Sequence, residues 1–116
     1  MRYFDETISI LQTFKDNPNP WVQRSIGVAA HFFAKRVRNN PDKVKRVIAL
    51  LSPYFEEKDN RIVKGIGWGF KTIGRYYPDL LTYYLKSQSG KNPSRTLLNK
   101  ALTYLPEERK QEIRGK

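Results

Sequence analysis

The sequence predicts an all-α protein in which antiparallel helix pairs stack side by side. Apolar residues recur every three or four positions along most of the chain, which is the spacing of one face of a helix. Prolines next to helix-capping residues divide these stretches at regular intervals, and no stretch shows the alternation of a half-buried strand. We therefore expect seven helices, at residues 3–15, 20–38, 41–56, 60–77, 78–88, 93–104 and 106–114.

Most of these helices have a recognisable start. Three Asn-Pro pairs, at residues 19–20, 40–41 and 92–93, combine a capping side chain with a proline at the first helical position. Asp59 and Asn60 cap the fourth expected helix. Acidic residues follow Pro78 and Pro106, where the helix dipole favours negative charge.

The helices also repeat. A shift of about 40 residues lays Arg24–Gly27 on Lys64–Gly67, and the helices that follow these segments match as well. A helix pair of about 40 residues is typical of HEAT-like solenoids, in which each pair buries its apolar face against its neighbours. Chance similarity between two amphipathic helices is the alternative. We expect one domain over residues 1–116.

The first expected helix has an apolar stripe of its own but no capping unit before it. Solenoid ends usually need such a cap. Either a partner chain or a second copy covers this face, or the chain corresponds to the C-terminal part of a longer domain.

Composition narrows the function. Lys and Arg number 22 and Asp and Glu 11, so the net charge is +11, which indicates a polyanionic partner, nucleic acid before anionic lipid. The 39% of hydrophobic residues excludes a disordered basic tail. The absence of cysteine excludes disulfides and thiolate zinc sites, and His31 is the only histidine, so we expect no metal site. No apolar run approaches a membrane span, and we expect a cytoplasmic protein.

The positive charge is expected to cluster on one face. On a helical wheel of residues 60–77, five residues share one sector: Arg61, Lys64, Trp68, Lys71 and Arg75. The matching sector of the second helix holds Arg24, His31 and Lys35, and Lys100 lies one turn before Tyr104 in the sixth. Equivalent helices of a solenoid lie along one wall. These cations are therefore predicted to bind nucleic-acid phosphates.

Trp68 has two interpretations. Among four cations and off the apolar face, it is suited to contact a base or a sugar; alternatively, it packs on the neighbouring repeat. Trp21 is expected to pack at a helix junction, and the lone His31 to be a surface residue without a catalytic role. Gly65, Gly67 and Gly69 indicate close helix packing, because glycine inside a helix is otherwise destabilising.

Two segments carry a family resemblance. Asn19–Ile26 resembles the Trp-x-x-Arg stretch of the DNA alkylation repair glycosylases that are built from HEAT-like repeats, and Lys64–Lys71 is similar to their Lys-Ala-Ile-Gly-Trp-x-x-Arg segment. The resemblance covers most of this chain and the C-terminal half of the family's domain. It implies a curved helical stack with a basic concave face for duplex DNA, and excision of bases such as 3-methyladenine and 7-methylguanine without a cofactor.

By this resemblance, Arg24 would grip the DNA backbone near the lesion and Trp68 would contact the lesion's deoxyribose. Lys71 stands where the family has arginine, which keeps the charge but loses a bidentate fork. The family's catalytic aspartate precedes the arginine matched by Arg24. Residues 1–23 contain no Trp-x-x-x-Asp, and Asp5 and Asp16 do not fit.

We therefore expect a DNA-binding relative of the glycosylases that is a weak or inactive base-excision enzyme on its own, because no carboxylate stabilises the sugar cation as the base leaves. One alternative is a competent glycosylase whose acid comes from a partner or from another residue. The other is a protein-interaction scaffold without nucleic-acid binding, a common use of helical solenoids.

Overall fold

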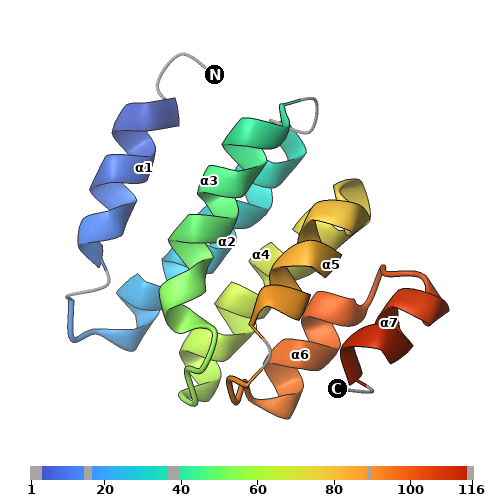
Figure 1. The fold of residues 1–116 in the computed structure, drawn as a ribbon. Helices are drawn as coiled ribbons and strands as arrows, with labels where there is room; N and C mark the ends of the chain where they lie inside the picture. The colour runs from blue at the N-terminus through green and yellow to red at the C-terminus, as the bar shows by residue number, and fades with distance from the viewer. Residues whose placement is uncertain (1–3, 15–16, 37–39, 89, 115–116) are drawn as a thin grey trace.

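In a computed structural model, residues 4–14, 17–36, 40–88 and 90–114 are described. This part of the chain contains seven α-helices and no strand, as predicted. The helices are α1 (Phe4–Thr13), α2 (Pro20–Arg36), α3 (Pro41–Leu51), α4 (Asn60–Tyr76), α5 (Pro78–Ser87), α6 (Arg95–Leu102) and α7 (Glu107–Arg114) (Figure 1). The expected helix ends at residues 3, 15 and 37–38 lie outside the described residues.

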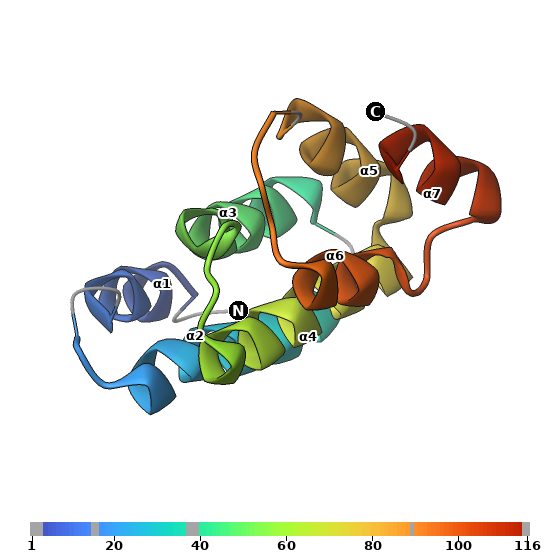
Figure 2. The same cartoon turned by 90° about the horizontal axis from the view of Figure 1, so that it is seen from below.

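The helices form two layers. Figure 2 shows α2, α4 and α6 side by side below, with α1, α3, α5 and α7 above them. Helices that follow one another in the chain run in opposite directions and alternate between the layers (Figure 1), so the predicted antiparallel helix pairs are confirmed. The α2–α4–α6 layer carries the sectors in which positive charge was expected.

Side-chain caps set the starts of several helices, α3, α4 and α6 among them. Asn40 Oδ1 accepts a hydrogen bond from the Lys43 amide at 3.2 Å, and Asp59 Oδ1 accepts one from the Arg61 amide at 2.9 Å, as their sequence positions predicted. The prediction for the sixth helix is wrong by two residues. Ser94, not Asn92, is its cap, and accepts from the Leu97 amide at 3.1 Å, so α6 begins at Arg95.

The third helix ends earlier than predicted. It was expected to reach residue 56, but α3 stops at Leu51 and a 3₁₀ turn over Ser52–Tyr54 follows. Pro53 is the physical reason, because it has no amide hydrogen to donate and its ring collides with the carbonyl one turn before it.

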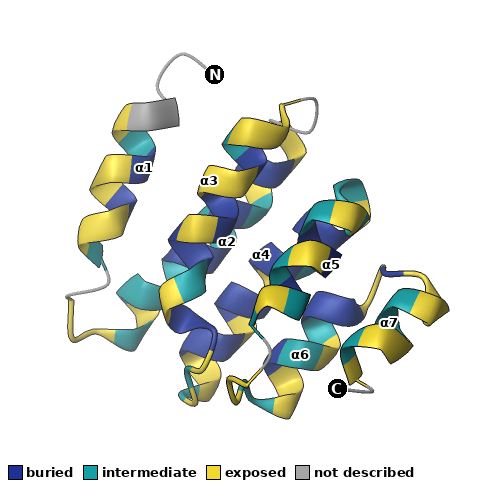
Figure 3. Ribbon diagram, viewed as in Figure 1, coloured by how far each residue is buried: buried dark blue, intermediate teal, exposed yellow. Residues whose placement is uncertain are grey.

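The core lies between the two layers, and Figure 3 shows buried residues on helices of both. Helix α4 is central and packs against α2, α3, α5 and α6. Its Ile66, Phe70 and Ile73 are completely buried. The Phe70 ring stacks on the Tyr84 ring of α5 with 5.6 Å between centroids, which joins the two layers.

Glycines allow α2 and α4 to pack backbone against backbone. A Cβ added to Gly27 would overlap the carbonyl of Gly65, and one added to Gly65 would overlap the carbonyl of Arg24. A Cβ on Gly69 would lie 3.0 Å from the Gly27 oxygen, and one on Gly67 only 2.6 Å from Lys100 Cδ. The close packing predicted for this glycine series is confirmed. It holds the two helices in a fixed parallel register.

Candidate nucleic-acid interface

That register creates a shallow hollow on the exposed face of the α2–α4–α6 layer. Its volume is about 140 Å³, and its lining comes from all three helices and their ends: His31, Lys35, Trp68, Lys71, Thr72, Arg75, Tyr76 and Tyr104. Four of the predicted binding residues therefore meet here, namely Lys35, Trp68, Lys71 and Arg75. His31, Thr72, Tyr76 and Tyr104 complete the hollow and were not predicted as site residues.

Trp68 is held in place by aromatic side chains of α2. Its ring stacks on His31 with 4.2 Å between centroids and 23° between planes, and meets the edge of Phe32 at 6.5 Å. Trp68 therefore packs on the neighbouring helix α2, as the second interpretation expected. Trp68 nevertheless stays 37% exposed, so one side of a rigidly supported indole still borders the hollow.

The hydrogen bonds around Thr72 determine which nitrogen of His31 carries the proton. Thr72 Oγ1 donates its single proton to the Trp68 carbonyl at 3.1 Å and is also hydrogen-bonded to His31 Nδ1. Nδ1 must then be the donor, which leaves a lone pair on Nε2. Burial and, to a smaller extent, the positive charge of Lys35 lower the pKa of His31. The imidazole is thus a neutral base at neutral pH.

Tyr104 gathers two of the cations. Lys71 Nζ and the Arg75 guanidinium each lie 5.6 Å from the centre of its ring, and Arg75 also lies 5.7 Å from the ring of Tyr76. Attraction between a cation and an aromatic face favours these placements. No carboxylate is part of the lining, and no ion pair joins Lys35, Lys71 or Arg75 to another described residue. The hollow therefore has an uncompensated positive charge.

The other predicted cations lie outside this hollow. Arg24 is nearer the start of α2, where its guanidinium lies 5.9 Å from the ring of Trp21. Trp21 is 57% exposed, so the prediction that it packs at a helix junction is wrong: in the first turn of α2 it faces solvent instead of the core. The aliphatic part of Lys100 covers Gly67.

Arg61 and Lys64, both near the start of α4, differ in whether a carboxylate already pairs with them. The Arg61 guanidinium forms a two-point ion pair with the Asp59 carboxylate, at 3.1 and 2.9 Å. This hydrogen-bonded pair lowers the pKa of Asp59 and raises that of Arg61. Lys64 is exposed and has no ion pair with a described residue. Of the two, Lys64 is therefore more available to an anion.

The acidic residues do not supply a carboxylate to Trp68. None of those whose side chains are described lines the hollow, and Asp16 and the side chain of Asp5 lie outside the described part of the chain. Within that part, no three histidine or acidic side chains are grouped so that they could hold a metal ion. None of the described helices is long and apolar enough to cross a membrane.

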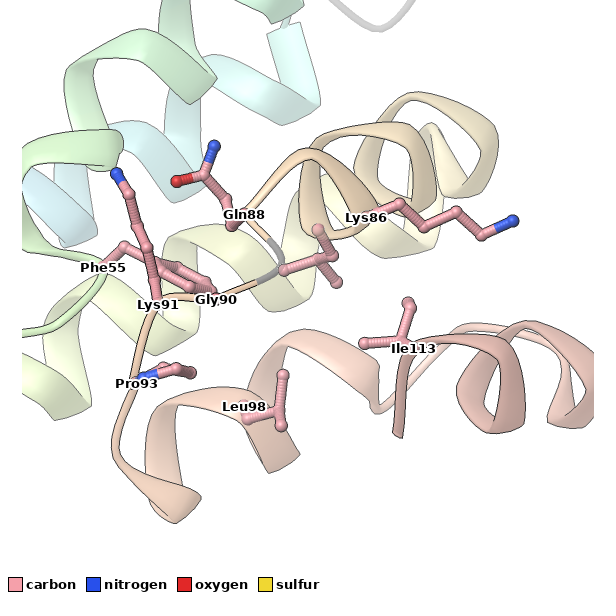
Figure 4. Close-up of a pocket in the computed structure, with 9 residues that line it drawn as sticks. Phe55, Lys86, Gln88, Gly90, Lys91, Pro93, Leu98 and Ile113 are labelled. Atoms are coloured by element: carbon pink, nitrogen blue, oxygen red, sulfur yellow. The ribbon is translucent and has the colours of Figure 1, made fainter. Parts of the chain in front are cut away.

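A second hollow, of about 120 Å³, lies between α5, α6 and α7 (Figure 4). Lys86 pairs with Glu112 at 2.7 Å and its ammonium points away from Pro93 and Leu98 in the close-up. The lining of this second hollow is mainly apolar and lacks the exposed aromatic rings of the first hollow. Its chemistry does not favour a polyanion.

The fold and the hollow define an all-α protein of antiparallel helix pairs with a basic, aromatic face. Residues 1–105 match the model of a family described as DNA alkylation repair enzyme, which is most of the chain. The protein belongs to this family, and the resemblance carried by its two tryptophan-containing segments is confirmed. DNA is the substrate that membership suggests. Neither a curated protein nor a solved structure matches the chain.

Proposed function

We propose that the protein binds duplex DNA without sequence preference, through contacts to phosphates. The main evidence for this proposal is the hollow in which Lys35, Lys71 and Arg75 surround a partly exposed Trp68. No carboxylate is part of its lining. Arg24 and Lys64 extend the phosphate contacts toward the N-terminal ends of α2 and α4. Trp68 contacts a sugar or a displaced base. Lys100 and Arg61 contribute less, since one covers a glycine and the other is paired.

Physical chemistry supports an anion over other ligands. A positively charged concave face concentrates a polyanion, and the release of its counterions supplies the affinity. An indole that is already stacked on one side loses little conformational freedom when a sugar or base covers the other. The protein would be cytoplasmic and would bind there to chromosomal DNA.

We further propose that base excision by this chain alone is weak. Loss of an alkylated base leaves positive charge on the sugar, and a nearby carboxylate is the group that stabilises it. The hollow offers cations and a neutral imidazole in its place. A release assay on duplex DNA that carries 7-methylguanine tests this, and turnover comparable to that of a dedicated glycosylase would contradict it.

Binding is tested with a labelled duplex, with and without an abasic-site analogue, over a salt titration. With about five phosphate contacts, the logarithm of the affinity should fall with the logarithm of salt concentration at a slope of about −4.5. Lys64→Glu combined with Lys71→Glu should weaken binding strongly and reduce the slope to about −2.7. The matched control is Lys45→Glu with Lys91→Glu, two exposed lysines outside the α2–α4–α6 layer.

Unchanged affinity of the Lys64→Glu, Lys71→Glu variant at low salt would refute the proposal. Absence of DNA binding by the parent protein at low salt would do the same, and a tight, salt-insensitive protein complex would then favour the scaffold alternative. A second copy or partner over α1 stays a prediction, tested by the oligomeric state in solution.

A further inference from the structure

Two groups of the hollow can do more than bind a phosphate. One is the lone pair of His31 Nε2, which the hydrogen bond from Nδ1 to Thr72 makes available. The other is the amine of Lys35, one turn further along the same face of α2. Lys35 forms no ion pair and no ring contact with a described residue, whereas the Lys71 ammonium is held over Tyr104.

A primary amine beside a neutral base is a combination with known chemistry. Lysine amines form imines with carbonyl groups, and a positioned imidazole removes protons from carbon next to such an imine. The carbonyl group that a DNA repair site encounters is the aldehyde of an abasic sugar, which exists once the base is gone and the ring has opened.

We propose that the hollow acts on abasic sites in DNA as a β-elimination lyase, with Lys35 as nucleophile and His31 as proton acceptor. The inference rests on the proposed DNA binding but not on base excision. The proposed substrate is the abasic site that base excision leaves behind, and its β-elimination needs no catalytic carboxylate.

The steps balance without an oxidant, a metal or a co-reactant other than water. The unprotonated Lys35 amine attacks C1′ of the open-chain sugar; the carbon–nitrogen bond forms and the carbonyl oxygen leaves as water. His31 Nε2 takes a proton from C2′, and the electron pair released moves into the conjugated system as the C3′–O bond breaks and the 3′ phosphate departs. Water then hydrolyses the imine and restores the amine.

Electrostatics favours this substrate over an alkylated base. Bases methylated at purine N3 or N7 carry positive charge, and Lys71 and Arg75 repel them because the lining contains no carboxylate. An abasic sugar is uncharged and lies between two phosphates. Lys71 and Arg75 can hold those phosphates and stabilise the one that leaves, while the open side of Trp68 covers the sugar.

Borohydride trapping tests the covalent step, because it reduces the imine to a stable protein–DNA adduct. The probe is a duplex with one natural abasic site. Lys35→Arg keeps the charge but cannot form an imine, so the adduct should fall by about tenfold or more. The control is Lys45→Arg, the same exchange on α3 in the other layer, which should trap like the parent protein.

His31→Gln separates the second step from the first. Glutamine can still donate a hydrogen bond to Thr72 but is not a base, so the adduct should persist while strand cleavage falls by about 100-fold. Thermal unfolding of both variants confirms that they are folded. Normal trapping by Lys35→Arg, or normal cleavage by His31→Gln, would overturn the assignment of that residue.

A duplex with a tetrahydrofuran analogue distinguishes failure of this inference from failure of the proposed function, because the analogue has no aldehyde. If the parent protein binds the analogue but yields no adduct with the natural abasic site, lyase activity is refuted and DNA binding stands. If it binds neither duplex at low salt, the proposed function fails as well.

Discussion

Among exchanges of the described glycines for alanine, Gly27→Ala should be the most damaging. The new Cβ would overlap the backbone of Gly65 and the Ile66 amide nitrogen across the α2–α4 contact. Neither group can rotate away, because both belong to the backbone of a central helix. The two helices must therefore separate, and the contacts of completely buried neighbours such as Ile26 and Ile66 are disturbed.

Two effects of opposite sign set the magnitude. Overpacking a tight core costs about 1–3 kcal/mol, and an obstacle made of backbone belongs at the upper end of that range. Alanine gains about 1 kcal/mol over glycine in a helix interior. The free energy of unfolding should therefore fall by about 2 kcal/mol, which lowers the Tm of a domain of this size by about 10 °C.

Gly67→Ala is the matched comparison, since it makes the same exchange in α4. Its Cβ would meet Lys100 Cδ at 2.6 Å, the flexible part of a partly exposed side chain that can move into solvent. Helix propensity then dominates, and stability should be unchanged or slightly higher. Urea and thermal unfolding followed by circular dichroism measure both variants. A Gly27→Ala protein as stable as the parent, or less affected than Gly67→Ala, would refute the reasoning.

Three further outcomes follow from the site. The folded state lowers the pKa of His31 from its ordinary value of 6.5, first through burial and then through the charge of Lys35. Because the unfolded chain then binds a proton more readily, the free energy of unfolding should fall as the pH drops below 6.5. Unfolding curves recorded at several pH values measure this fall, and His31→Gln should reduce it. Trp68→Ala should reduce affinity for the abasic-site duplex by about tenfold, measured by fluorescence anisotropy, through loss of one stacking surface; unchanged affinity would exclude contact with the DNA. Arg61→Ala should weaken DNA binding less than Lys64→Ala, because Asp59 already holds Arg61, and the reverse order would contradict the assigned roles.

Local sequence signals predicted most of the fold because they act over one or two helical turns. Asn40 and Asp59 cap the helices that their positions indicated. The two errors also have local causes: Pro53 ended α3 before residue 56, and Ser94 competed with Asn92 for the cap of α6. For α6, a second capping side chain lay two residues from the predicted one.

The site was predictable only in part, because half of it depends on how helices meet. A helical wheel placed Trp68, Lys71 and Arg75 on one sector, and the repeat added Lys35. A wheel cannot show that Tyr104, which follows α6, lies against two of these cations. The 40-residue register that aligned Arg24 with Lys64 was the available signal for pairing His31 of α2 with residues near Trp68.

The glycine contact connects the fold to the site. Because α2 and α4 touch through backbone at Gly27 and Gly65, side chains one and two turns further along meet without a gap, and His31 reaches both Trp68 and Thr72. A larger separation would break this stacking and change which atom of the imidazole faces the hollow. A Gly27→Ala protein that remains folded should therefore lose strand cleavage at abasic sites as well as stability, although no methyl group enters the hollow itself.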